Sequence, residues 1–98
     1  MAVDHTARVA IPDGVLFREL EGESVLLNLN SESYFGLDDV GTRMWSVLTT
    51  SESIQAAYER LLAEYKVEPD KLSHDLETLI TKLIEQGLIK IESIQHPA

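Results

Sequence analysis

Histidine is the side chain that most often transfers protons or binds a metal, and the chain contains three, His5, His74 and His96. His74 lies between Ser73 and Asp75, so the residue types of a hydrolytic triad stand in a row. Successive residues of a helix point about 100° apart, however, and three consecutive side chains there cannot meet. His5 and His96 lie near the chain ends, where structure is often frayed. We therefore interpret the three histidines as unrelated surface residues.

The other polar residues form no catalytic or metal-binding pattern. The sequence has no helix-borne pair of zinc ligands and no calcium-binding loop. Gly36 and Gly41 flank an expected helix start, but they lack the companion residues of a phosphate-binding loop. Glu19, Glu21 and Glu23 stand near no feature that would adapt them to catalysis, so we interpret them as part of a solvated strand surface. The sequence thus predicts a protein that is not an enzyme and that binds neither a cofactor nor a metal.

Composition narrows the choice of partner and compartment. The 98 residues are enough for one domain, and their formal net charge of −9 disfavours nucleic acid and favours a neutral or basic partner. Without cysteine the chain can form no disulfide, which is typical of a reducing cytoplasm. No apolar run is long enough to span a membrane, and residues 1–14 lack the order of a signal peptide. We expect a cytoplasmic protein that does not bind a membrane.

The expected domain occupies residues 15–91, between an N-terminal extension at 1–14 and a tail at 92–98. The extension ends in a Pro-Asp-Gly turn. Two strand-like runs follow, with Gly22 at the bend of a hairpin, and Ser33 to Leu37 form a third, short strand at a sheet edge. In the second run, apolar and polar residues alternate as in a strand with one buried face. Val25, Leu27 and Leu29 share one face of this run, and Leu26, Asn28 and Asn30 share the other.

After Leu37 the apolar period changes from two residues to about 3.6, which predicts helices. Asp38 and Ser53 are the expected caps of the first and second helices, and Pro69 and Gly87 bound a third. Residues 88–91 can add a brief strand. The order predicts an α+β fold similar to a winged helix-turn-helix, in which a three-stranded antiparallel sheet is followed by three helices that pack on one side of it.

Two features point to binding. The strand at residues 33–37 has an apolar middle and would leave an open sheet edge. The third helix has an apolar face wider than a small core needs. Each feature is also compatible with ordinary core packing, but together they predict a groove between strand and helix. The wide apolar face of the helix consists of Leu72, Leu76, Leu79, Ile80, Leu83 and Ile84.

Two other functions fit the fold. A winged-helix DNA-binding transcriptional regulator would place its third helix in a major groove, but here that helix carries Lys71 and Lys82 against a larger number of acidic residues. These acidic residues are Asp70, Asp75, Glu77 and Glu85. An oligomerisation adaptor could instead use the open edge to pair with its own copy.

The ordered segments "YFGLDDVG", "MW", "SIQAAYERL", "EYKVEP" and "LSHDLETLITKLIEQGLI" resemble the PqqD-like family, whose members are peptide-binding modules known as RiPP recognition elements. The resemblance covers residues 15–91. It implies that the leader segment of a ribosomally made precursor peptide docks as an added strand and is presented to a modifying enzyme, a leader protease or a radical-SAM enzyme. The sequence departs from many members at "TTSES", where they have an Asp-Gly turn, and this leaves the leader motif open. Trp45 and the absence of a fused domain favour a free-standing lasso-peptide module.

The same resemblance implies which residues bind the leader peptide. The strand positions are Ser33, Tyr34, Phe35, Gly36 and Leu37. The positions on the third helix are Leu72, Asp75, Leu76, Leu79 and Lys82.

Overall fold

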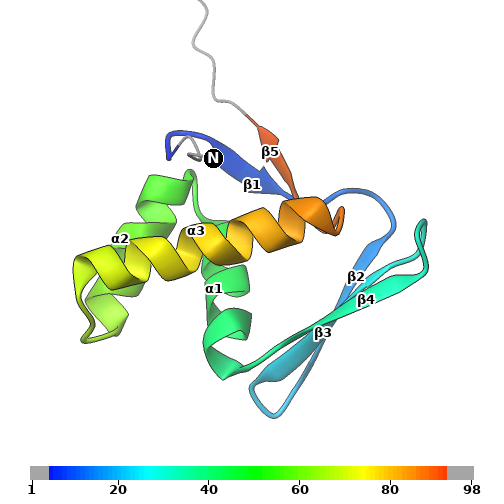
Figure 1. The fold of residues 1–98 in the computed structure, drawn as a ribbon, viewed down its shortest axis with the longest axis horizontal. Coiled ribbons are helices and arrows are strands. Elements are labelled where there is room, and N and C mark those ends of the chain that lie inside the picture. Colours follow the sequence, from blue (N-terminus) through cyan, green and yellow to red (C-terminus); the bar gives the residue numbers. More distant parts are fainter. Residues whose placement is uncertain (1–4, 93–98) are drawn as a thin grey trace, which may run out of the picture.

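The computed structural model describes residues 5–92, which fold into three helices and five strands (Figure 1). Along the chain these elements are β1 (Arg8–Ala10), β2 (Val15–Leu20), β3 (Glu23–Asn28), β4 (Ser33–Leu37), α1 (Asp39–Thr50), α2 (Ile54–Glu64), α3 (Pro69–Glu85) and β5 (Lys90–Glu92). The helices lie on one side of the sheet formed by β2, β3 and β4. The predicted α+β fold, a three-stranded antiparallel sheet followed by three helices, is confirmed.

Tight turns join the three strands in the order β2-β3-β4, and both pairings are antiparallel. Glu21 and Gly22 both have positive φ, 54° and 85°, as a two-residue hairpin turn requires. Glu32 has a φ of 58° in the next turn. The predicted hairpin and the third strand at residues 33–37 are therefore present, with Gly22 at the bend.

The face of β3 that packs against the helices is formed by Ser24, Leu26 and Asn28, all of which are buried. The Ser24 and Thr42 hydroxyls lie 2.7 Å apart in a buried hydrogen bond between β3 and α1. On the opposite face Val25 remains 43% exposed although it is apolar. The strand thus has one buried face, as the alternation predicts, but its exposed face is also apolar.

The residues expected to begin the first two helices do so. The Asp38 carboxylate accepts a hydrogen bond from the Gly41 amide at 2.7 Å, and the Ser53 hydroxyl accepts one from the Ala56 amide at 3.0 Å. Pro69 occupies the first turn of α3, where its lack of an N–H leaves no bond unmade.

A second sheet, formed by β1 and β5, connects the two ends of the described chain. Arg8 lies opposite Glu92 in this antiparallel pair. Val9 is buried, and the Ala7 carbonyl accepts a hydrogen bond from the Ile54 amide at 2.8 Å. Residues 7–10 therefore pack against the rest of the fold, and the domain bounds expected at residues 15 and 91 stay a prediction. The short strand expected at residues 88–91 is present as β5, while residues 93–98 of the expected tail, including His96, lie outside the described residues.

Candidate functional site

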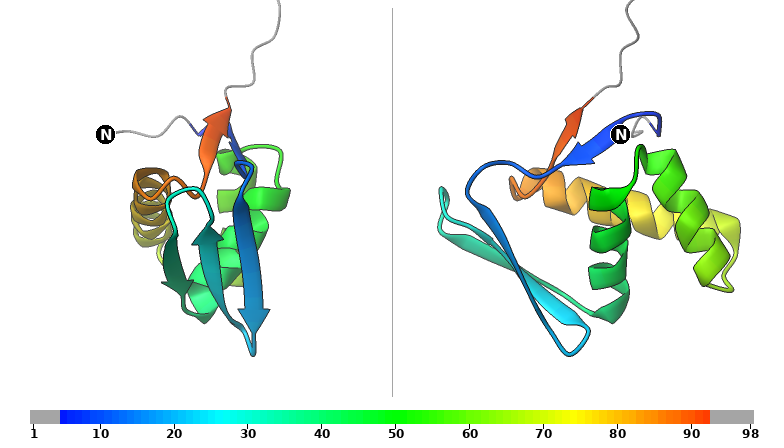
Figure 2. Two further views of the ribbon diagram at one scale, coloured as in Figure 1. Left: turned by 90° about the vertical axis from the view of Figure 1, so that its right-hand side faces the viewer. Right: turned by 180° about the vertical axis from the view of Figure 1, so that it is seen from behind.

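One side of β4 has no partner strand among residues 5–92. On its other side β4 pairs with β3 along its whole length, from Ser33 opposite Asn28 to Leu37 opposite Ser24. Two views of the fold show β4 on the α3 side of the sheet and β2 on the far side (Figure 2). The β4 edge therefore offers backbone donors and acceptors that another extended chain could pair with.

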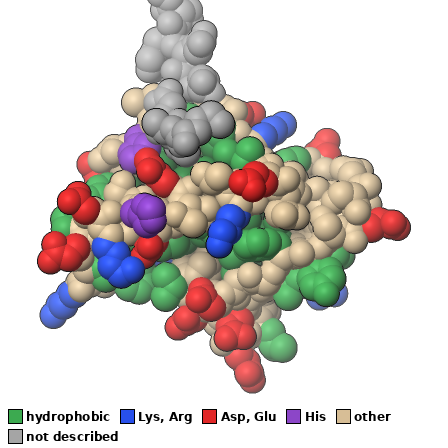
Figure 3. Space-filling view, viewed as in Figure 1, with side chains coloured by type: hydrophobic (Ala, Val, Ile, Leu, Met, Phe, Trp, Pro, Cys, Tyr) green, Lys and Arg blue, Asp and Glu red, His purple; other side chains and the backbone are tan. Residues whose placement is uncertain are grey.

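A cavity of about 390 Å³ opens between the end of β4 and α3, and we refer to it as the groove. Apolar surface is visible beside α3 on the side of the sheet (Figure 3). The residues that line the groove are Phe35, Gly36, Leu37, Asp38, Gly41, Asp75, Thr78, Leu79 and Lys82.

Six of the ten residues that the family resemblance implied meet in this groove: Phe35, Gly36, Leu37, Asp75, Leu79 and Lys82. Ser33 and Tyr34 belong to β4 but lie beyond the lining, and the Tyr34 side chain is 76% exposed on the other face of the strand. The expected strand and helix are thus brought together at one surface.

Two of the expected groove residues have their side chains in the core instead. Leu72 is 3% and Leu76 is 1% exposed, so neither is available to a ligand. The apolar face of α3 is wide because it serves two surfaces. Leu72, Leu76, Ile80 and Leu83 are buried in the core, and the partly buried Leu79 lines the groove.

Sequence reasoning missed three lining residues, Asp38, Gly41 and Thr78. Thr78 lies three residues after Asp75, and this helical spacing could have identified it. Gly41 lies in the first turn of α1, close to the end of β4, and a Cβ added there would lie 3.2 Å from a Leu37 methyl carbon. The absence of a side chain at Gly41 therefore leaves this end of the groove open, a role that no sequence pattern indicates.

Charges border the apolar part of the groove. The Lys71 ammonium donates to the Asp75 carboxylate at 3.1 Å, one turn along α3. Lys82 forms no ion pair with any other residue in the range 5–92, so its ammonium can meet a carboxylate or carbonyl of a ligand. Within the same range no group of three His, Cys, Asp or Glu side chains could hold a metal ion.

Asn28 fixes the position of the sheet relative to α3. Its side-chain amide donates to the Gly87 carbonyl at 3.1 Å, just beyond the helix. Its side-chain oxygen accepts from the Asn30 and Ser31 amides, at 2.9 and 3.2 Å, in the turn that leads to β4. One buried side chain thus joins the β3–β4 turn to the end of α3, and so holds the two walls of the groove at a set separation.

A family model described as coenzyme PQQ synthesis protein D (PqqD) matches residues 23–89 of the chain. The chain belongs to the PqqD family. The match runs from β3 to the residue before β5 and includes every residue of the groove.

Two solved structures are similar to this PqqD-family chain. One is "TbiB1 in Complex with the TbiA(beta) Leader Peptide", which is 33% identical, covers 83% of this chain and 94% of its own, and has a TM-score of 0.77. The other is "Lasso peptide synthetase B1 complexed with the leader peptide", which is 25% identical, covers 86% of this chain and 99% of its own, and has a TM-score of 0.76. Among curated proteins, none matches the chain significantly.

The surface of α3 does not favour the DNA-binding alternative. Lys71 is already paired with Asp75, which leaves Lys82 as the unpaired cation of the described helix. Four acidic residues of α3 would repel a phosphate backbone.

None of the helices in residues 5–92 combines the length and the hydropathy needed to cross a bilayer.

Proposed function

We propose that this protein binds the leader segment of a ribosomally synthesised precursor peptide and presents the precursor to a modifying enzyme in the cytoplasm. The leader pairs as an additional antiparallel strand with β4 and inserts apolar side chains into the groove against α3. The enzyme is a leader protease or a radical-SAM enzyme. The two similar structures, both complexes with leader peptides, favour a lasso-peptide pathway.

The observation that carries the proposal is that the unpaired edge of β4 borders the groove. Phe35, Gly36 and Leu37 belong to both features. Backbone hydrogen bonds along a strand edge bind any extended chain, whereas a pocket beside the strand selects side chains. A strand edge beside a pocket therefore suits a peptide that is recognised by its sequence and is not cut or altered at the place where it binds.

The contacts between the leader and the groove must offset the conformational entropy that the leader loses on binding. A leader that is disordered when free loses conformational entropy on docking, so backbone pairing alone gives weak binding. Two or three apolar anchors in the groove bring the affinity into the usual nanomolar-to-micromolar range, about −8 to −12 kcal/mol. Phe35, Leu37 and Leu79 are the apolar side chains of the groove that such anchors would contact.

Binding of the leader assists modification only when the rest of the precursor reaches the active site of an enzyme. A protein that binds the leader and also contacts the enzyme makes the second encounter intramolecular, which raises the effective concentration of the core peptide at the active site. No bond chemistry is needed from the PqqD-family protein itself.

A fluorescence-polarisation titration with the labelled leader encoded beside this gene tests the proposal. We expect saturable binding, and a scrambled leader of the same composition should bind at least about tenfold more weakly. Hydrogen exchange of the β4 amides should slow in the complex, because strand addition protects them. Absence of saturable binding rejects the proposal.

The other two functions give different results in matched experiments. Sequence-selective binding of duplex DNA with a steep salt dependence would favour a regulator. A concentration-dependent dimer that the leader does not disturb would favour an oligomerisation adaptor.

A further inference from the structure

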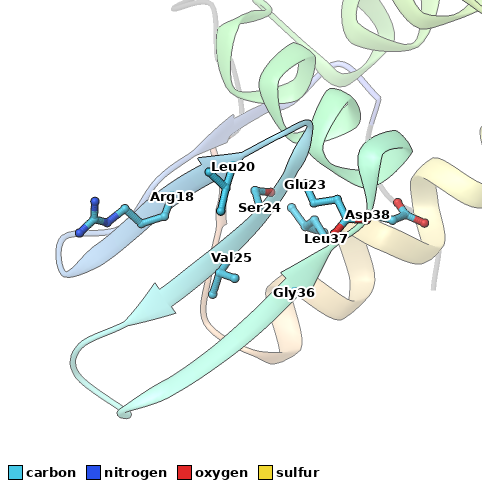
Figure 4. A pocket seen from close by; sticks show the side chains of 8 residues that line it. All are labelled: Arg18, Leu20, Glu23, Ser24, Val25, Gly36, Leu37 and Asp38. Atoms are coloured by element: carbon cyan, nitrogen blue, oxygen red, sulfur yellow. The ribbon is translucent and has the colours of Figure 1, made fainter.

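A second hollow lies on the face of the three-stranded sheet that is turned away from the helices. It has a volume of about 610 Å³, and we refer to it as the outer hollow. Its lining residues come from all three strands and from Asp38, the residue after β4 (Figure 4). They are Arg18, Leu20, Glu23, Ser24, Val25, Gly36, Leu37 and Asp38.

A single row of residues crosses the sheet through this hollow. Arg18 of β2 lies opposite Val25 of β3, and Val25 lies opposite Gly36 of β4. Val25 in this row and Leu20 beside it are 43% and 76% exposed, so the hollow has an apolar floor that the described chain does not cover. The row ends at the β4 edge with Gly36, which has no side chain.

Neither backbone conformation nor crowding requires glycine at position 36. Gly36 is not among the residues with positive φ, and a Cβ added there would have no neighbouring atom within 4 Å. Glycine inside a strand costs stability and often marks a place where a ligand comes close. At this place its effect is to leave the outer hollow open toward the β4 edge.

We infer that the outer hollow receives a second side chain of the docked leader, an inference that rests on the proposed function. Side chains of an added strand alternate between the two faces of the sheet. Those on the helix side enter the groove, and the next residue along points outward beside Gly36. The two hollows adjoin at the β4 edge, where Gly36, Leu37 and Asp38 line both.

The outward side chain must be large and apolar. Neighbouring strands lie about 4.8 Å apart, so the added strand lies about 10 Å from β3. A leucine, methionine or aromatic side chain can lean across Gly36 to contact Val25, whereas a small one cannot reach it. The leader recognised by this protein therefore has bulky apolar residues at two adjacent positions, one for the groove and one for the outer hollow.

Gly36→Val tests the inference, because it fills the open end of the row with a residue that suits a strand and meets no neighbouring atom. Leu16→Val is the matched control, since it alters an exposed apolar residue on the same face of the sheet, in the strand farthest from β4, that does not line the hollow. Val25→Thr is a second variant that keeps the shape of the floor and makes it polar. Each is titrated with the leader and with leaders carrying single alanine substitutions, and tryptophan fluorescence checks folding.

We expect Gly36→Val to weaken leader binding by about tenfold or more, Val25→Thr to weaken it by a smaller factor, and Leu16→Val to stay within about twofold of the unaltered protein. One apolar leader residue should lose its alanine effect in Gly36→Val, and it should be adjacent to the residue that loses its effect in Leu79→Ala.

If Gly36→Val and Val25→Thr both bind within about twofold of the unaltered protein, the outer hollow has no role even though the groove does. Weaker binding without coupling to any single leader residue also rejects the inference. If the unaltered protein does not bind the leader at all, the proposed function fails first.

Discussion

Phe17 and Trp45 stack with their ring centroids 5.9 Å apart and their planes 11° from parallel, which joins the sheet to α1. Trp45 is 3% exposed, and Phe17 packs against the same core from β2. Because α1 follows directly from β4, this contact helps to fix the strand that borders the groove.

Phe17→Ala should lower the free energy of unfolding by about 2 to 4 kcal/mol, since it removes both the partly buried ring and the stacking. Trp45 is the sole tryptophan of the chain, so its fluorescence reports urea unfolding directly. Leu16→Ala, on the exposed face of the same strand, is the control and should cost much less. If Phe17→Ala and Leu16→Ala lower the free energy of unfolding equally, the stacking of Phe17 on Trp45 does not add to the stability.

Leu79→Ala should weaken leader binding by about tenfold while the protein remains folded, because Leu79 lines the groove and is only partly buried. Ile84→Ala changes the same residue class on the exposed part of α3, outside the groove, and should leave the affinity unchanged. Leu76→Ala should instead lose about 2 to 5 kcal/mol of stability, because that leucine is in the core. Urea unfolding and leader titration of all three variants separate the two effects, and a Leu79→Ala protein with full affinity would contradict the groove.

Gly87→Ala should destabilise the protein by about 1 kcal/mol or more, for two reasons. Gly87 has a φ of 68° after the end of α3, and an added Cβ would lie 3.1 Å from the side-chain nitrogen of Asn28. Displacing Asn28 changes the separation of the groove walls, so leader affinity should fall as well. Gly22→Ala serves as the control, since Gly22 also has positive φ but no atom near an added Cβ. It should lose stability and keep its affinity, as measured by thermal unfolding and titration.

Glu64→Gln should remove a pH-dependent contribution to stability that comes from the contact of Glu64 in α2 with Arg43 in α1. The pKa of Glu64 is lowered, chiefly by its hydrogen bonds with Arg43, whose Nε lies 2.9 Å from Oε2. A carboxyl with a lowered folded-state pKa stabilises the fold above its unfolded pKa of about 4.3, and this contribution is lost as the pH falls through the folded value.

The unaltered protein should therefore have the higher urea midpoint at neutral pH, and the difference from Glu64→Gln should disappear in acid. The effect is small because the pair is exposed to solvent. A difference that stays constant down to pH values below about 4 would show that the charge of Glu64 does not contribute.

Local signals were enough to predict the fold. Asp38 and Ser53 mark helix starts through hydrogen bonds made within a few residues, and Pro69 marks one through its fixed φ, so a sequence pattern can identify all three. The strand β1 escaped prediction because it is three residues long and its partner, β5, lies at the other end of the chain. Such pairing depends on distant contacts that local periodicity does not contain.

The groove could be predicted only in part for a related reason. The spacing of the leucines in α3 shows that they share a broad face, but not where the core ends and the surface begins. Leu76 and Leu79 are three residues apart, yet one is buried in the core and the other faces the groove. That division depends on how closely the other elements approach α3, which only the assembled structure shows.

Antiparallel pairing of β1 with β5 brings the two ends of the described chain side by side, away from the β2–β3 turn (Figure 1). A short linker could therefore join these ends into a ring, and the ring could be opened in the α2–α3 connection without separating any two paired strands. Such a circularly permuted protein would keep β4 and α3 facing each other although its chain began with α3. The binding surface thus depends on the packing of the elements and not on their order along the polypeptide.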